Sequence, residues 1–135
     1  MAVFFLSTRG SSWYETQGWL SEDEECTWYQ SRDDNVCVNG IMQVLSLEAT
    51  GLNGLLPNKI ALLHSLTYLD LSSNSLAGAI PSEIGALTTL EWLHLSANSL
   101  NGTIPSEIGA LTTLTYLDLS SNSLTGSIPS EIGAL

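Results

Sequence analysis

A motif that occurs three times in succession with a period of 24 residues is the feature that most constrains the fold of this chain. These copies start at Leu66, Leu90 and Leu114, and no residue is inserted between them. A more degenerate copy precedes them, so the predicted repeats are 42–65, 66–89, 90–113 and 114–135. A fixed period in the twenties is typical of solenoids, in which each repeat forms one coil and only stacked coils bury a core.

Apolar residues two positions apart, such as Leu69 and Leu71, predict a short strand at the head of each repeat. The leucines of this strand are expected to face the core, and the residues between them, such as Asp70, to face solvent. The inward-facing set of one full repeat is predicted as Leu66, Leu69, Leu71, Leu76, Ile80, Ile84 and Leu87. Burying these few side chains cannot offset the conformational entropy of a whole coil, so the repeats must fold together.

The rest of each repeat predicts a turn and a short helical segment. Asn74 recurs as Asn98 and Asn122, and its side chain is expected to bond to the turn backbone and to form a ladder between coils. Gly78 and Pro81 predict a bend, and the segment 81–87 one turn of 3₁₀ or α helix. The predicted fold class is an α/β repeat solenoid, a right-handed superhelix with a concave parallel sheet and helical turns on the convex side.

The two ends of the chain differ from the repeats. Residues 1–41 are predicted as an N-terminal helical cap, and Trp13, Trp19, Leu20 and Trp28 as the apolar residues that cover the first coil. The last repeat reaches Leu135 without a polar capping segment, so we expect an open apolar end. Such an end predicts either a longer array or end-to-end self-association.

Composition excludes some partners. A formal net charge of -11 argues against nucleic acid or an anionic membrane surface as a partner. Cys26 and Cys37 are the only cysteines and are predicted as one pair, and a disulfide there would imply an oxidising compartment. Two isolated cysteines make a poor metal site, and the acidic residues of the cap favour a solvated surface over a calcium site. No cofactor or metal is predicted.

The repeat motif resembles a known family. The pattern Leu-x-x-Leu-x-Leu-x-x-Asn-x-Leu-x-Gly-x-Ile-Pro-x-x-Ile-Gly-x-Leu is similar to plant-type leucine-rich repeats of receptor-kinase ectodomains and polygalacturonase-inhibiting proteins. The segments 8–13, 18–21 and 26–29 resemble the N-terminal caps of leucine-rich-repeat proteins in diatoms and related algae. This resemblance implies a non-enzymatic extracellular module, secreted or part of a receptor, that binds a peptide, a protein or a carbohydrate.

Stacked repeats would place equivalent residues in rows across the concave sheet, because parallel strands lie about 4.8 Å apart. The predicted rows are Val44, Tyr68, Trp92, Tyr116; Ser46, Asp70, His94, Asp118; and Glu48, Ser72, Ser96, Ser120. The predicted ligand-binding residues are the aromatic and charged members Tyr68, Asp70, Trp92, His94, Tyr116 and Asp118, which supply contact area and directional hydrogen bonds. The alternative is that the aspartates keep the sheet soluble and the rings stabilise cross-strand packing.

His94 lies between Asp70 and Asp118 in its row. Two flanking carboxylates are expected to favour the imidazolium, which would make ligand binding sensitive to mild acid. A catalytic Asp-His-Ser interpretation with Ser72 or Ser96 is disfavoured, because repetition alone produces this set and no oxyanion donor is evident. The chain is therefore predicted not to be an enzyme.

Two features lie away from the concave face. Asn101-Gly102-Thr103 is the sole N-glycosylation sequence and is predicted to be exposed. Thr88-Thr89 and Thr112-Thr113 form a hydroxyl ladder, which keeps an ice-binding function open as an alternative. A structural or adhesive scaffold is the third function class.

Overall fold

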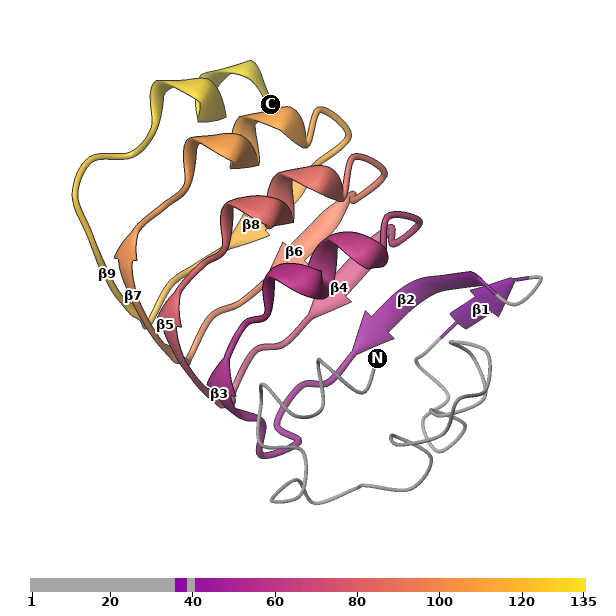
Figure 1. Ribbon diagram of the computed structural model, residues 1–135, viewed down its shortest axis with the longest axis horizontal. Helices are drawn as coiled ribbons and strands as arrows, with labels where there is room; N and C mark the ends of the chain where they lie inside the picture. Colours follow the sequence, from indigo (N-terminus) through magenta and orange to yellow (C-terminus); the bar gives the residue numbers. More distant parts are fainter. Residues whose placement is uncertain (1–35, 39–40) are drawn as a thin grey trace.

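The computed structural model describes residues 36–38 and 41–135, which form a solenoid of stacked coils (Figure 1). Its strands and 3₁₀ helices, in chain order, are β1 Val36–Val38, β2 Ile41–Ser46, β3 Asn53–Leu55, η2 Asn58–Leu62, β4 Tyr68–Asp70, β5 Ser75–Ala79, η3 Ser82–Ala86, β6 Trp92–His94, β7 Ser99–Thr103, η4 Ser106–Ala110, β8 Tyr116–Asp118, β9 Ser123–Thr125 and η5 Ser130–Ala134. The predicted repeat solenoid, with a parallel sheet on one face and helical turns on the opposite face, is confirmed.

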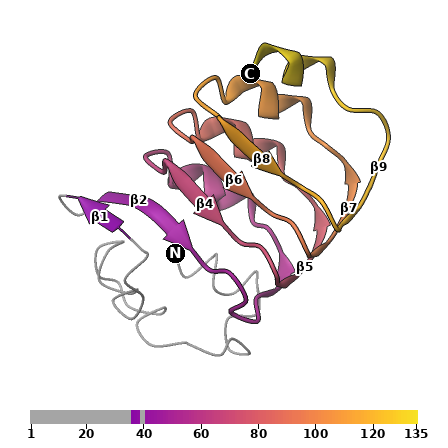
Figure 2. The same ribbon diagram turned by 180° about the vertical axis from the view of Figure 1, so that it is seen from behind.

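Two sheets run along the solenoid. The first has the strand order β1-β2-β4-β6-β8, and the second has the order β3-β5-β7-β9. In the first sheet β1 pairs with β2 antiparallel, and all later pairs are parallel. The register keeps each repeat opposite the next, since Leu45 pairs with Leu69, Leu69 with Leu93, and Leu93 with Leu117. Figure 2 shows β2, β4, β6 and β8 side by side, with the 3₁₀ turns on the side behind them.

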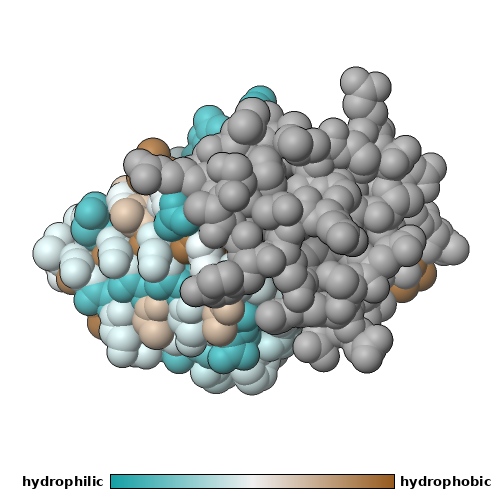
Figure 3. Space-filling view, turned by 90° about the horizontal axis from the view of Figure 1, so that it is seen from below, coloured by the Kyte–Doolittle hydropathy of each residue, from teal (hydrophilic) through white to brown (hydrophobic). Residues whose placement is uncertain are grey.

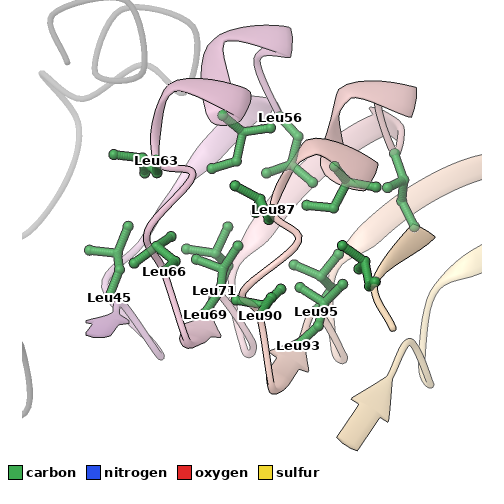
Figure 4. Close-up of a cluster of buried hydrophobic side chains, with 14 of the residues drawn as sticks. Leu45, Leu56, Leu63, Leu66, Leu69, Leu71, Leu87, Leu90, Leu93 and Leu95 are labelled. Carbon is green, nitrogen blue, oxygen red and sulfur yellow. The ribbon is translucent and has the colours of Figure 1, made fainter. Parts of the chain in front are cut away.

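The core lies between the first sheet and the 3₁₀ turns, as the close-up of its leucines shows (Figure 4). Every residue predicted to face inward in the repeat 66–89 is buried. The same positions of the last repeat are less covered, and the partly buried members of the core include Leu117, Leu119, Leu124 and Ile132. Burial therefore depends on having a coil on each side, as expected for a solenoid.

The asparagine ladder is present as predicted. The amide of Asn98 donates to the carbonyls of Leu95 and Ser96 in its own turn and of Leu71 in the preceding coil. Its Oδ1 accepts the backbone N–H of Leu76, also in the preceding coil, at 2.9 Å. Asn74 and Asn122 make the same set of bonds. One side chain therefore satisfies turn carbonyls and ties two coils together.

The segment that follows the asparagine in each repeat is a strand, not only the bend that the sequence predicts. The segment predicted as a bend at Gly78 belongs to β5, so a second parallel sheet runs where only a turn was expected. Gly78 has a φ of 75°, which confirms that glycine is needed there for its backbone angles. The 3₁₀ turn η3 starts at Ser82, and Pro81 occupies the position before it without any side-chain cap.

Several predictions fall outside the described residues. They are the helical character of the predicted cap, its tryptophans and Leu20, and Cys26 with its pairing to Cys37. The cap boundary at residue 41 and the disulfide therefore stay predictions. In the described part of the chain, no helix combines the length and apolar character that a membrane span needs.

Candidate functional site

The candidate site is the side of the first sheet that faces away from the 3₁₀ turns, which we call the sheet face. The predicted rows form there, because the register pairs Tyr68 with Trp92 and Trp92 with Tyr116. The next row is formed by Ser46, Asp70, His94 and Asp118, which are also paired strand to strand. The structure therefore brings all six predicted ligand-binding residues onto one face of the first sheet, where Asp70 is buried and the other five are partly exposed.

The aromatic row is a stack of rings. The Tyr68 and Trp92 ring centroids are 5.7 Å apart with an interplanar angle of 18°, and those of Trp92 and Tyr116 are 3.7 Å apart at 12°. Ring faces are therefore used in contacts between repeats, as the cross-strand packing alternative predicts. The indole N–H of Trp92 is buried and has no hydrogen-bond partner in the described part of the chain.

His94 joins the two aspartates of its row. Its Nδ1 lies 3.2 Å from Asp70 Oδ2, and its Nε2 lies 3.2 Å from Asp118 Oδ2. The ring edge also contacts Tyr116 in a T-shaped arrangement, with centroids 6.0 Å apart. In the protonated state this imidazole can donate to both carboxylates, which connects β4, β6 and β8 across the sheet face.

The two aspartates have different environments. Asp70 is 5% exposed, and its carboxylate accepts the backbone N–H of Ser72 at 2.9 Å and the Tyr68 hydroxyl at 3.4 Å. Asp118 is more exposed, with 27% of its side-chain surface accessible. Hydrogen bonds from the Ser120 side chain and backbone, with a smaller contribution from His94, lower the pKa of Asp118.

This burial corrects one expectation. Asp70 and Ser72 were predicted to face solvent, but both are buried, and the Ser72 hydroxyl has no partner among the described residues. A buried aspartate contributes little to the solubility of the sheet, so the solubility alternative does not account for Asp70. Its position is instead explained by the donors that surround its carboxylate.

The residues of the disfavoured catalytic interpretation are in contact. Ser96 Oγ lies 2.7 Å from His94 Nε2, while His94 Nδ1 lies against Asp70. A general base needs a free lone pair on Nε2, and here the same nitrogen also faces the carboxylate of Asp118. Nε2 is therefore shared between the Ser96 hydroxyl and a second carboxylate, an arrangement unlike that of a serine activated by one dedicated base.

A pocket lies at the N-terminal end of the sheet face. It has a volume of about 430 Å³ and is lined by Val44, Ser46, Glu48, Tyr68 and Asp70. The sequence placed these residues in neighbouring rows but did not reveal the pocket. Within residues 36–38 and 41–135 there is no group of three or more His, Cys, Asp or Glu side chains that could hold a metal ion.

The threonine ladder lies in the turns that join each 3₁₀ helix to the next strand of the first sheet, and two of its hydroxyls are tied to the backbone. The Thr89 hydroxyl lies within donor distance of the carbonyls of His64 and Leu66, and that of Thr113 of Thr88 and Leu90. Asn101 is exposed on β7, as predicted.

Comparisons with known proteins agree with this architecture. A model of the Leucine Rich Repeat family matches residues 65–87, 89–111 and 113–135, about half of the chain. The ectodomain of the Arabidopsis thaliana membrane receptor kinase GASSHO1/SCHENGEN3, solved in complex with CASPARIAN STRIP INTEGRITY FACTOR 2, is 42% identical. That match covers 68% of this chain and 11% of the receptor chain, with a TM-score of 0.67.

Two smaller structures match almost the whole chain. The BIR2 ectodomain from Arabidopsis thaliana is 32% identical over 99% of this chain and 74% of its own, with a TM-score of 0.76. A plant ice-binding protein is 28% identical over 98% of this chain and 51% of its own, with a TM-score of 0.71. A comparison with curated proteins found no match.

The share of the relative's own length that this chain covers differs between the matches. It spans less than a fifth of the length of the larger receptor structures. The family model nevertheless matches the three regular repeats, and the BIR2 ectodomain is 32% identical over almost the whole chain. The chain therefore belongs to the leucine-rich-repeat family, and its repeats are of the plant type.

Proposed function

We propose that this chain is a non-enzymatic extracellular recognition module that binds a peptide or protein partner on its sheet face. The observation that carries the proposal is the pairing of the stacked row Tyr68, Trp92, Tyr116 with the hydrogen-bonded row Asp70, His94, Asp118. Aromatic residues next to oriented polar groups are typical of protein recognition surfaces. The likeness to receptor ectodomains, including one solved with a bound factor, supports the same proposal.

The ring geometry favours a peptide or protein over a carbohydrate. Sugars commonly bind by packing against an open ring face, and the faces of Trp92 are stacked between Tyr68 and Tyr116. The row therefore presents ring edges to a partner, and the polar row beside it presents carboxylate and imidazole groups. Extended peptide backbone, which offers N–H and C=O groups along its length, matches such a surface.

The experiment is a binding screen with the full chain immobilised, against an array of synthetic plant secreted peptides and an array of cell-wall glycans. We expect binders on the peptide array. The variants Trp92→Ala and Asp118→Asn should each weaken a peptide hit by at least tenfold, because they remove a central ring and the carboxylate that contacts His94 Nε2. Titration calorimetry measures the change.

A matched control separates the site from the fold. Thr112→Ala alters an exposed residue in the turn between η4 and β8, outside both rows of the sheet face, and should leave the affinity unchanged. Circular dichroism of each variant checks that the coil remains folded. Binders confined to the glycan array, or affinity that Trp92→Ala and Asp118→Asn leave intact, would exclude a peptide site on the sheet face.

Ice binding is a second candidate, favoured by one specific observation. The exposed residues of β5, β7 and β9 form an uncharged surface, which we call the second-sheet face; they are Ser75, Ala79, Ser99, Asn101, Thr103, Ser123 and Thr125. Figure 3 shows residues of intermediate hydropathy recurring in rows across the repeats on the visible surface. Small hydroxyl-bearing residues at a strand spacing of about 4.8 Å offer a regular lattice to water. The likeness to a plant ice-binding protein supports this candidate.

This face suits ice better than the threonine ladder, in which the Thr89 and Thr113 hydroxyls each lie near two backbone carbonyls, because Thr125 has one such contact, at 3.3 Å, and Thr103 has none with a described residue. Thermal hysteresis of the purified chain tests the candidate. Activity should be present in the parent, lost in Thr103→Lys and retained in Thr112→Lys, which places the same charge in the turn between η4 and β8. A parent without thermal hysteresis removes ice binding, and a parent lacking both activities leaves the scaffold alternative.

A further inference from the structure

We infer that Asn101 on the second-sheet face is an N-glycosylation site. The residue begins the sequence Asn101-Gly102-Thr103, which has the required hydroxyl residue two positions on and no proline between. The inference rests on the extracellular location in the proposed function, because the modifying enzymes act in the secretory pathway. It concerns a surface that the proposed peptide site does not use.

The amide of Asn101 is available, unlike those of the ladder asparagines. Asn98 and Asn122 use their amide nitrogens on three backbone carbonyls each, and their Oδ1 atoms accept a backbone N–H. The Asn101 side chain makes no hydrogen bond to any described residue and is exposed. Its alternation with buried Leu100 directs it away from the core.

The surroundings of Asn101 can accommodate a sugar. It pairs with Ala79 on β5 and with Ser123 on β9, both of which have small, exposed side chains. Thr103, which supplies the hydroxyl, is also exposed. The folded coil therefore tolerates a glycan at this position, which a core-facing or ladder asparagine would not.

The chemistry needs one co-reactant, an oligosaccharide carried on a polyprenyl diphosphate. Nδ2 of Asn101 forms a bond to the anomeric carbon of the sugar while the bond from that carbon to the diphosphate oxygen breaks. The diphosphate leaves with the bonding electrons, and the amide nitrogen loses one proton. No oxidant or reductant is involved.

A glycan here would separate the two candidate functions. The sheet face would stay open to a peptide, because Asn101 lies on a different sheet from Trp92 and His94. The second-sheet face would be covered at its central strand β7, so a glycosylated chain could not present that lattice to ice.

The test is secretion of the full chain from eukaryotic cells behind a heterologous signal peptide, followed by intact-mass analysis before and after a peptide N-glycosidase. We expect a glycan on the parent, which Asn101→Gln and Thr103→Ala abolish and Thr103→Ser retains. Thr125→Asn creates Asn-Gly-Ser at the equivalent position of the next repeat and should add a second glycan. Ala77→Asn creates no such sequence and should add none.

These variants make the outcome decisive. A secreted parent with the unmodified mass, alongside a Thr125→Asn variant modified at residue 125, would overturn the inference. A secreted parent and Thr125→Asn variant that are both unmodified would overturn it as well. Because the readout is mass, its failure is distinguishable from loss of peptide binding on the sheet face.

Discussion

In each turn of the asparagine ladder, one asparagine side chain makes several of the hydrogen bonds that stabilise the turn. Asn98→Ala removes bonds to the carbonyls of Leu71, Leu95 and Ser96 and to one backbone N–H. We expect the free energy of unfolding to fall by about 2–4 kcal/mol, since each lost hydrogen bond contributes roughly 0.5–1.5 kcal/mol. Urea unfolding followed by circular dichroism measures it.

Asn101 supplies the control for this prediction. Asn101→Ala changes the same residue type in the same coil, but the side chain is exposed and makes no bond to the described residues. Its free energy of unfolding should match that of the parent. Equal losses for both variants would show that the ladder bonds do not stabilise the coil.

At the residue scale, the sequence predicts which residues align across the strands better than it predicts how buried each residue is and what it contacts. The 24-residue period placed Tyr68, Trp92 and Tyr116 in one row because register alone determines that row. It could not predict the burial of Asp70, which depends on the rotamers of Tyr68 and His94 beside it. Nor could it predict that Trp92 stacks closely on Tyr116 and more distantly on Tyr68.

At the element scale, the stacked 3₁₀ turns require glycine for close approach. A Cβ added to Gly109 would lie 2.5 Å from Glu131 Cβ and 2.7 Å from its carbonyl oxygen in the next coil. Gly109→Ala should therefore lower the free energy of unfolding by about 1–3 kcal/mol through overpacking. Thermal and urea unfolding of the variant provide the measurement.

The last turn offers the matched substitution. A Cβ on Gly133 meets no atom within 4 Å, so Gly133→Ala should leave stability unchanged or slightly raised. A Gly109→Ala variant as stable as Gly133→Ala would mean that the turns η4 and η5 separate at no cost.

Some strands and turns could be predicted from the sequence, and the second sheet could not. The strands β4, β6 and β8 and the turns η3 and η4 follow from apolar spacing and from Pro-Ser-Glu-Ile-Gly, so they could be predicted. The second sheet could not, because Ser75–Ala79 contains small residues and a glycine at positive φ rather than β-branched or aromatic residues. That strand exists because the asparagine ladder and the first sheet already hold successive coils in register.

At the scale of the whole molecule, burial decreases toward the last coil. Leu93 is fully buried between coils, whereas the equivalent Leu117 is only partly buried. Leu93→Ala should cost about 2–5 kcal/mol of unfolding free energy, as large-to-small changes in a closed core do. Leu117→Ala should cost less, because fewer packing contacts and less apolar area are lost there.

The same pair of variants tests end-to-end association of this chain. If two copies pack through the coil that carries Leu117, that side chain becomes covered in the dimer and its truncation weakens the interface. The midpoint of urea unfolding of the parent would then rise with protein concentration, and it would rise less in Leu117→Ala than in Leu93→Ala. Sedimentation velocity at two concentrations provides an independent measurement. A concentration-independent midpoint and a single monomer boundary would exclude self-association through this end.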